Sequence, residues 1–268
     1  MQPVRPGIRL FAHTYNLWSF LFYLLLAVSL GVILATFLDY GITIDEPPQV
    51  EYGKEIIQWY SSLFQYQAYF DRVKILDLER YGGLFETLAY PFIQLLPFST
   101  FDTRHLINAL IGLSGILAAY RLGTALGSPA LGLLSALFLL LTPRYYGHIF
   151  NNPKDLPFAV FYLWSIYAIV LCLSDLPGLG WKRIGLTGLA LGLALGTRVG
   201  GLVLFGYLGL FFLLRSLQII LQDKSQQPLD LLRQTIPQLV GIYAIAWLTM
   251  LIFWPTAQKA PLTFPIDA

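Results

Sequence analysis

Cysteine and histidine are scarce in this sequence, and their scarcity removes several common kinds of site. The only cysteine, Cys172, falls in the middle of an apolar run. A lone cysteine supports neither a disulfide framework nor a cysteine metal cluster. The sequence also contains no His-Glu-x-x-His motif, no Gly-rich phosphate loop and no serine nucleophile elbow. The common soluble catalytic classes are therefore excluded.

Charged residues are few as well. They make up 12% of the 268 residues, whereas a soluble domain carries about a quarter. The formal net charge is only +2 and the basic residues form no run or stripe, which argues against nucleic-acid binding. Hydrophobic residues account for 56% of the chain. We therefore predict an all-α polytopic membrane protein.

Long apolar runs predict about seven membrane-spanning helices. The first, residues 17–38, is long enough to cross about 30 Å of hydrocarbon. No cleavage pattern follows it, so it is interpreted as a signal anchor whose basic flank, with Arg5, Arg9 and His13, is cytoplasmic. The later spans are predicted at residues 105–126, 130–143, 155–174, 184–197, 199–221 and 235–254. The third and fifth of the seven are short for a straight crossing.

Residues 39–103 form a polar but aromatic-rich loop after the first span. Within it, Val50, Gly53, Ile57, Tyr60 and Phe64 recur at helical spacing with charged residues between them. This pattern predicts a helix that lies along the membrane surface. A second such helix is predicted over residues 84–96, ending at Pro97.

The distribution of cations predicts the two faces of the protein. With the N-terminus inside, Lys182, Arg183, Arg215, Lys224 and Arg233 fall on the cytoplasmic side, as the positive-inside rule expects. Arg144, Lys154 and Arg198 then fall outside, against the rule. We interpret these three as cations kept there to hold an anionic group. The alternative is that seven is the wrong number of spans.

Two adjacent carboxylates, Asp45 and Glu46, directly follow the first span. Carboxylates at the end of a span are costly unless they work in a wet cleft or start a helix. Thr43 with Glu46 fits a capping box, and Asp45 fits an N-cap equally well. On helix signals alone, capping and function are equally supported. Their place just outside the bilayer favours a functional role for Asp45.

A second constellation spans residues 142–157 on the same predicted side. Asn152 as N-cap, Pro153 at the first helical position and Asp155 in the first turn make an ordinary helix start. A helix N-terminus beside Lys154 is also a ready anion site. His148 is a weaker candidate, because one histidine without two further ligands is more often structural than a metal ligand.

The order of these features resembles the GT-C superfamily of membrane glycosyltransferases. The features are a span, an outer Asp45-Glu46 pair, a surface helix, the outer segment Asn152-Pro153-Lys154-Asp155-Leu156-Pro157, and a Gly-rich hairpin with Arg198. The branch most similar to it contains the protein O-mannosyltransferases and aminoarabinose transferases. Nearly the whole chain shares this order, but only the Asp45-Glu46 and 152–157 stretches are motif-like.

The resemblance implies transfer of a sugar from a polyprenyl-phosphate donor to a hydroxyl-bearing protein or lipid on the non-cytoplasmic face. It implies that Asp45 is the catalytic base. It places Glu46, Lys154 and Asp155 in the donor or acceptor pocket. The residue patterns described above add Arg144, His148, Asn152 and Arg198 as substrate-binding candidates. The sequence requires no cofactor and leaves a divalent metal open.

The same resemblance sets the expected organisation. We expect residues 1–268 to form one transmembrane domain, the N-terminal part of a longer enzyme, in a bacterial plasma membrane. Two other functions are compatible with the sequence: a multi-span transporter, and a non-catalytic scaffold or assembly subunit. A transporter predicts inverted repeats and charges near the midplane, whereas here the charges gather at the predicted outer face.

Overall fold

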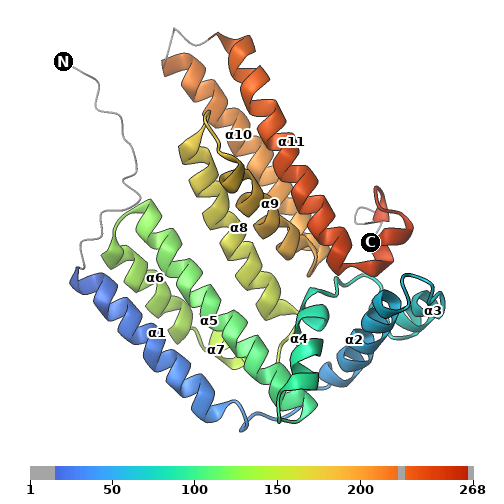
Figure 1. Cartoon of the computed structure of the whole chain (residues 1–268). Helices are drawn as coiled ribbons and strands as arrows, with labels where there is room; N and C mark the ends of the chain where they lie inside the picture. The colour runs from blue at the N-terminus through green and yellow to red at the C-terminus, as the bar shows by residue number, and fades with distance from the viewer. Residues whose placement is uncertain (1–15, 223–226, 265–268) are drawn as a thin grey trace.

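The computed structural model describes residues 16–222 and 227–264, and every regular element in this part of the chain is helical (Figure 1). The long helices are α1 (Leu17–Thr36), α5 (Thr100–Leu126), α8 (Asp155–Asp175), α10 (Leu202–Gln222) and α11 (Pro228–Phe253). The shorter ones are α2 (Glu46–Ser61), α3 (Ala68–Ile75), α4 (Leu84–Leu95), α6 (Pro129–Leu141), α7 (Pro143–His148) and α9 (Trp181–Leu195), with the 3-10 turns η1 (Val199–Gly201) and η2 (Pro255–Lys259).

The apolar helices confirm a polytopic membrane protein. Five are long and apolar enough to cross a bilayer: α1, α5, α8, the joined η1 and α10, and α11. Helices α6 and α9 correspond to the third and fifth predicted spans and are indeed short, at 13 and 15 residues. At 1.5 Å per residue they reach only about 20 Å, less than the hydrocarbon thickness.

Glycines bring neighbouring helices into close contact, as small residues commonly do where helices pack in lipid. A Cβ added at Gly188 would lie 2.8 Å from the Ile242 carbonyl oxygen, and one at Gly192 would lie 2.6 Å from that of Ala246. Only glycine therefore lets α9 approach α11 this closely. Helix α8 packs against both α5 and α9 and so joins the two halves of the bundle (Figure 1).

The loop after α1 folds into α2, α3 and α4, which gather at one end of the bundle (Figure 1). Helix α4 occupies the range predicted for the second surface helix, whereas α3 was not predicted. Against the rest of the protein, α2 buries Gln49, Tyr52, Ile56 and Trp59 together with Gly53 of the predicted apolar face. Polar side chains such as Gln49 are buried because α4 and the residues before α8 supply partners for them.

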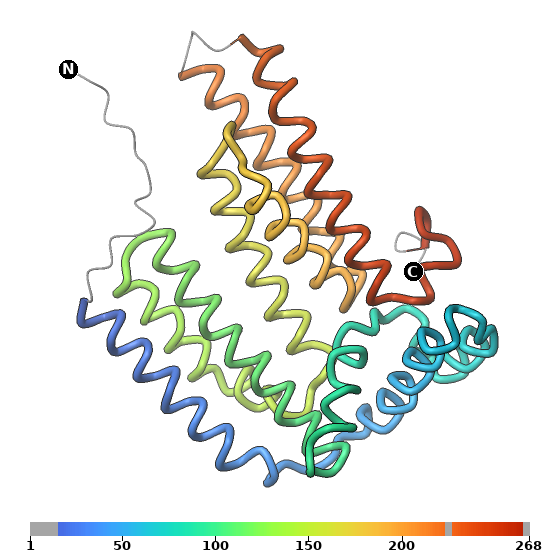
Figure 2. Tube along the Cα trace, in the orientation of Figure 1, coloured from blue at the N-terminus to red at the C-terminus, as the bar shows by residue number. Residues whose placement is uncertain are grey.

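The segments expected on the outer side all meet at this end of the molecule, as the tube in Figure 2 shows. The Thr43 hydroxyl lies 3.3 Å from the Asn151 carbonyl, and the backbone N–H of Gly82 donates to Thr197. Gly82 cannot carry a side chain, because its Cβ would come within 1.9 Å of the Gly196 carbonyl oxygen.

The basic residues predicted to be cytoplasmic belong to helix ends at the opposite end of the bundle. Lys182 and Arg183 are in the first turn of α9, Arg233 is in the second turn of α11, and Arg215 lies in the last two turns of α10. Lys224, Arg5, Arg9 and His13 lie outside the described residues.

Candidate active site

The two adjacent carboxylates have different surroundings. Glu46 is buried, and its Oε2 accepts hydrogen bonds from the Thr43 N–H at 2.7 Å and the Thr43 hydroxyl at 3.1 Å. Its Oε1 accepts from Nε2 of His105 in α5, at 2.9 Å. These bonds are the Glu half of the predicted capping box. Glu46 therefore fixes the turn before α2.

Asp45 makes no such contact. It occupies the residue before α2, yet its side chain forms no capping hydrogen bond. The side chain is 67% exposed, and its Oδ1 lies 3.9 Å from Nζ of Lys154. The alternative interpretation of Asp45 as a helix cap is not supported by this geometry. A carboxylate held next to a cation but otherwise open to solvent can accept a proton from a bound hydroxyl.

Lys154 is held by three neighbours at the start of α8. Its side chain is 19% exposed, and Nζ lies 5.0 Å from the centre of the Tyr81 ring. The Gln49 amide oxygen faces Nζ at 3.3 Å when its nitrogen faces Glu86, the orientation that satisfies both amide atoms. The ammonium is therefore positioned beside Asp45 by residues from two other segments.

Arg198 pairs with Asp155, with 2.5 Å between Nη1 and Oδ1. Its guanidinium carbon lies 5.3 Å from the centre of the same Tyr81 ring. Lys154, although adjacent to Asp155 in the chain, forms its ion pair with Asp45 instead. The approach of residues 81–84 to the end of α9 carries Tyr81 between the two cations, so Arg198 reaches Asp155 and Lys154 faces Asp45.

Asn152 acts as the predicted cap, although regular helix α8 begins only at Asp155. Its Oδ1 accepts the Asp155 N–H at 2.9 Å, and its Nδ2 donates to Nδ1 of His148 at 3.0 Å. His148 therefore has a structural hydrogen bond. Among the described residues no group of three His, Cys, Asp or Glu side chains could hold a metal ion.

Arg144 stands apart from this cluster. It is exposed on the short helix α7 and forms no ion pair within the described part of the chain. Its neighbours Pro143 and Tyr146 line an apolar groove of about 450 Å³ between α1, α5 and α6. Asp45, Lys154, Asp155 and Arg198 are thus brought together around Tyr81, and Arg144 is not part of that arrangement.

The comparisons with known proteins identify the family. The family model described as dolichyl-phosphate-mannose-protein mannosyltransferase matches residues 91–256, more than half of the chain. The chain belongs to this family. It is therefore a multi-pass membrane protein of a glycosyltransferase family. No curated protein and no solved structure matches the chain significantly.

The matched region of this mannosyltransferase family member contains Lys154, Asp155 and Arg198, while Asp45 lies before it. The family match therefore covers the segments that carry the cationic half of the cluster. The assignment of Asp45 depends on its order in the chain and on the geometry described above.

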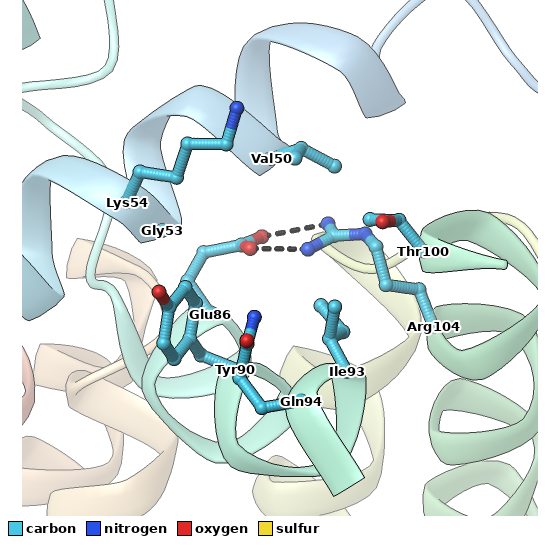
Figure 3. Close-up of a pocket in the computed structure, with 9 residues that line it drawn as sticks. All are labelled: Val50, Gly53, Lys54, Glu86, Tyr90, Ile93, Gln94, Thr100 and Arg104. Atoms are coloured by element: carbon cyan, nitrogen blue, oxygen red, sulfur yellow. Dashed lines mark hydrogen bonds and ion pairs between the residues drawn. The ribbon is translucent and has the colours of Figure 1, made fainter. Parts of the chain in front are cut away.

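Sequence reasoning missed a buried ion pair behind the cluster. Both terminal nitrogens of Arg104 in α5 bind the Glu86 carboxylate in α4, with Nη2 and Oε1 at 2.9 Å (Figure 3). The side chains are 2% and 3% exposed. One signal was available, since Glu86 is the only charged residue in the apolar helix α4. Such a charge needs a buried partner.

The pair forms one wall of a cavity of about 140 Å³, which Lys54, Tyr90, Gln94 and Thr100 also line (Figure 3). On its other side, Glu86 faces the Gln49 amide. The pair therefore separates this cavity from the Asp45 cluster and anchors α2, α4 and α5 to one another.

Tyr52 holds the backbone of Tyr81 in place. Its hydroxyl donates to the Tyr81 carbonyl oxygen at 2.7 Å. Burial, with smaller contributions from Tyr69 and Glu86, raises the pKa of Tyr52 well above its usual value. The phenol therefore stays protonated and keeps donating throughout the physiological pH range. This places the Tyr81 ring reproducibly between Lys154 and Arg198.

Proposed function

We propose that this protein catalyses inverting transfer of a sugar, with mannose the first candidate, from a polyprenyl phosphate to a hydroxyl group of a protein or lipid. The family match supports the reaction class and the kind of donor. The observation that carries the proposal is the exposed carboxylate of Asp45, free of any capping bond, 3.9 Å from the Lys154 ammonium.

The proposed reaction is a single displacement. The acceptor hydroxyl oxygen attacks the anomeric carbon while its proton passes to the Asp45 carboxylate. The bond between the anomeric carbon and the phosphate oxygen breaks, and the polyprenyl phosphate leaves with the electron pair. Attack opposite the leaving group inverts the anomeric configuration. Each step uses residues of this chain, so no cofactor is needed for the proton to be removed.

The cations then stabilise the phosphate. Charge develops on the phosphate oxygens as the bond breaks, and a positioned cation stabilises it most effectively in a site shielded from water. Lys154 is nearest to Asp45 and is therefore the first candidate. Arg198 is the second candidate, and it would release Asp155 in order to bind the phosphate. Arg144 would contribute only from the edge of the apolar groove.

The other candidates receive structural roles in this proposal. Glu46, with both oxygens bonded, places Asp45 at the start of α2. Asn152 and His148 hold the segment before α8, and Asp155 orients Arg198. The reacting end is assigned to the non-cytoplasmic face because Lys182, Arg183, Arg215 and Arg233 occupy the opposite end.

The test uses purified protein in lipid nanodiscs with polyprenyl-phosphate mannose and, in parallel, other polyprenyl-phosphate sugars. Release of polyprenyl phosphate is measured for the wild type, for Asp45→Asn and for the control Asp39→Asn. Asp39 is an exposed carboxylate in the same loop with no ion pair in the described structure. Loss of general-base catalysis should slow Asp45→Asn by about a hundredfold or more, the size of effect that such catalysis typically contributes.

Asp45→Asn keeps the shape of the side chain, so donor binding and folding should be unchanged. Asp39→Asn should turn over at the wild-type rate. If Asp45→Asn is as active as Asp39→Asn, then Asp45 is not the base. Absence of release from every lipid-linked sugar, with folded protein, would argue against the transferase activity itself.

A further inference from the structure

Gln49 lies between the buried ion pair and the proposed catalytic cluster. It is on α2, one helical turn after Asp45, and it is buried although it is polar. Its amide nitrogen faces Oε1 of Glu86 at 2.9 Å, and its amide oxygen faces Nζ of Lys154 at 3.3 Å. The side chain therefore connects an anion on one side to a cation on the other.

The two charges fix the orientation of this amide. A carboxylate accepts only, and an ammonium donates only. Reversing the Gln49 amide would place oxygen against oxygen and nitrogen against nitrogen. Glu86 is itself immobilised by both terminal nitrogens of Arg104. The amide oxygen therefore has one stable position, and that position holds Lys154.

The distance between Lys154 and Asp45 indicates what this arrangement does. Contact ion pairs with nitrogen donors have separations of about 2.7–2.9 Å, whereas Nζ of Lys154 remains 3.9 Å from Oδ1 of Asp45. A closer contact would stabilise the ionised carboxylate and make it a weaker base. The Gln49 oxygen and the Tyr81 ring both draw the ammonium away from that contact.

We propose that Gln49 is a positioning residue that holds the Lys154 ammonium back from Asp45, so that the carboxylate remains basic and the ammonium remains available to the departing phosphate. This inference rests on the proposed function. The ionisable groups around the pair come from every packed segment: Glu46 on α2, Tyr81 before α4, Glu86 on α4, Arg104 and His105 on α5, Asp155 on α8, and Arg198 before η1.

Two variants of Gln49 should shift the pH dependence in opposite directions. Gln49→Met removes the oxygen that holds Lys154. Because Glu86 is already bound by Arg104, the Lys154 ammonium should move towards Asp45. The acid limb of the pH–rate profile should then shift to lower pH by about 1 unit. Gln49→Glu places a carboxylate next to Lys154 and draws it from Asp45, so the acid limb should move up by a similar amount.

The turnover of Gln49→Met near neutral pH should fall several-fold, because a more strongly paired carboxylate accepts a proton less readily. The control is Gln58→Met, the same substitution at an exposed position of α2 whose side chain has no hydrogen bond in the described structure. Its pH profile and turnover should match those of the wild type.

A second measurement does not depend on activity. Lysines are labelled by reductive ¹³C-methylation, the Lys154 resonance is assigned with Lys154→Arg, and its pH titration is followed by NMR. The resonance should move in both Gln49 variants and not in Gln58→Met. If one Gln49 variant does not fold, the other still tests the sign of the shift.

The outcomes are distinguishable. A Lys154 titration that is unchanged in the Gln49 variants overturns the positioning role, whether or not the protein transfers sugar. A changed Lys154 titration with an unchanged pH–rate profile overturns the link to Asp45. A wild type without any transferase activity refutes the proposed function, while the NMR titration still tests whether Gln49 positions Lys154.

Discussion

Replacing the buried Arg104 with methionine should destabilise this protein more than the same substitution at an arginine that is not buried. Arg104 and Glu86 are almost completely buried and form two parallel hydrogen bonds between α5 and α4. Removing one partner of such a pair leaves an uncompensated buried charge, which costs about 3–5 kcal/mol. In Arg104→Met the Glu86 carboxylate would keep only the Gln49 amide as a donor. The expected loss of unfolding free energy is therefore near this range.

The double variant Arg104→Met/Glu86→Met tests the reason for that loss. It removes both charges and keeps side chains of moderate size, so most of the lost stability should return. The matched control is Arg121→Met on the same helix, because Arg121 pairs with no carboxylate in the described part of the chain. A change there should lie within about 0.5 kcal/mol.

Stability is measured by titrating the purified variants from mild detergent into sodium dodecyl sulfate and following helix content by circular dichroism. The single variant should unfold at the lowest dodecyl sulfate fraction, with the double variant close to the wild type. If Arg104→Met costs no more than Arg121→Met, the pair is not the anchor described here. A double variant as unstable as the single one would show that the loss arises from packing rather than from charge.

Two further predictions concern the contacts around Tyr81. Gly82→Ala should lower the free energy of unfolding by about 1–3 kcal/mol or more, because its Cβ would meet the Gly196 carbonyl oxygen at 1.9 Å. Gly41→Ala, where nothing lies within 4 Å of the added Cβ, should be nearly neutral. Equal thermal stability of the two variants would contradict the close approach. Arg198→Lys should weaken binding of polyprenyl-phosphate donors about as much as Arg198→Ala, because lysine lacks the planar fork that holds a phosphate through two hydrogen bonds. Unchanged donor affinity in both Arg198 variants, measured by competition in nanodiscs, would leave Arg198 with only its Asp155 contact.

The sequence by itself determined the long apolar helices and the segments that they bring together, although not the short helices α3 and α7. Long apolar runs and the Asn152 cap are local signals, because each depends on residues close in the chain. The alternation of helix directions then followed from the number of spans. That alternation alone places Asp45, Lys154 and Arg198 at one end of the bundle.

Only the tertiary structure decided which polar groups are partners. The sequence allows a capping role for either Asp45 or Glu46. In the structure Glu46 is hydrogen-bonded to His105, far away in the chain, while Asp45 is open to solvent. The sequence also cannot show that Asp155 pairs with Arg198 or that Glu86 pairs with Arg104. The stability of a buried or half-buried charge depends on a partner within a few ångströms. For these residues that partner comes from a distant segment, so its identity depends on how the helices pack rather than on local sequence.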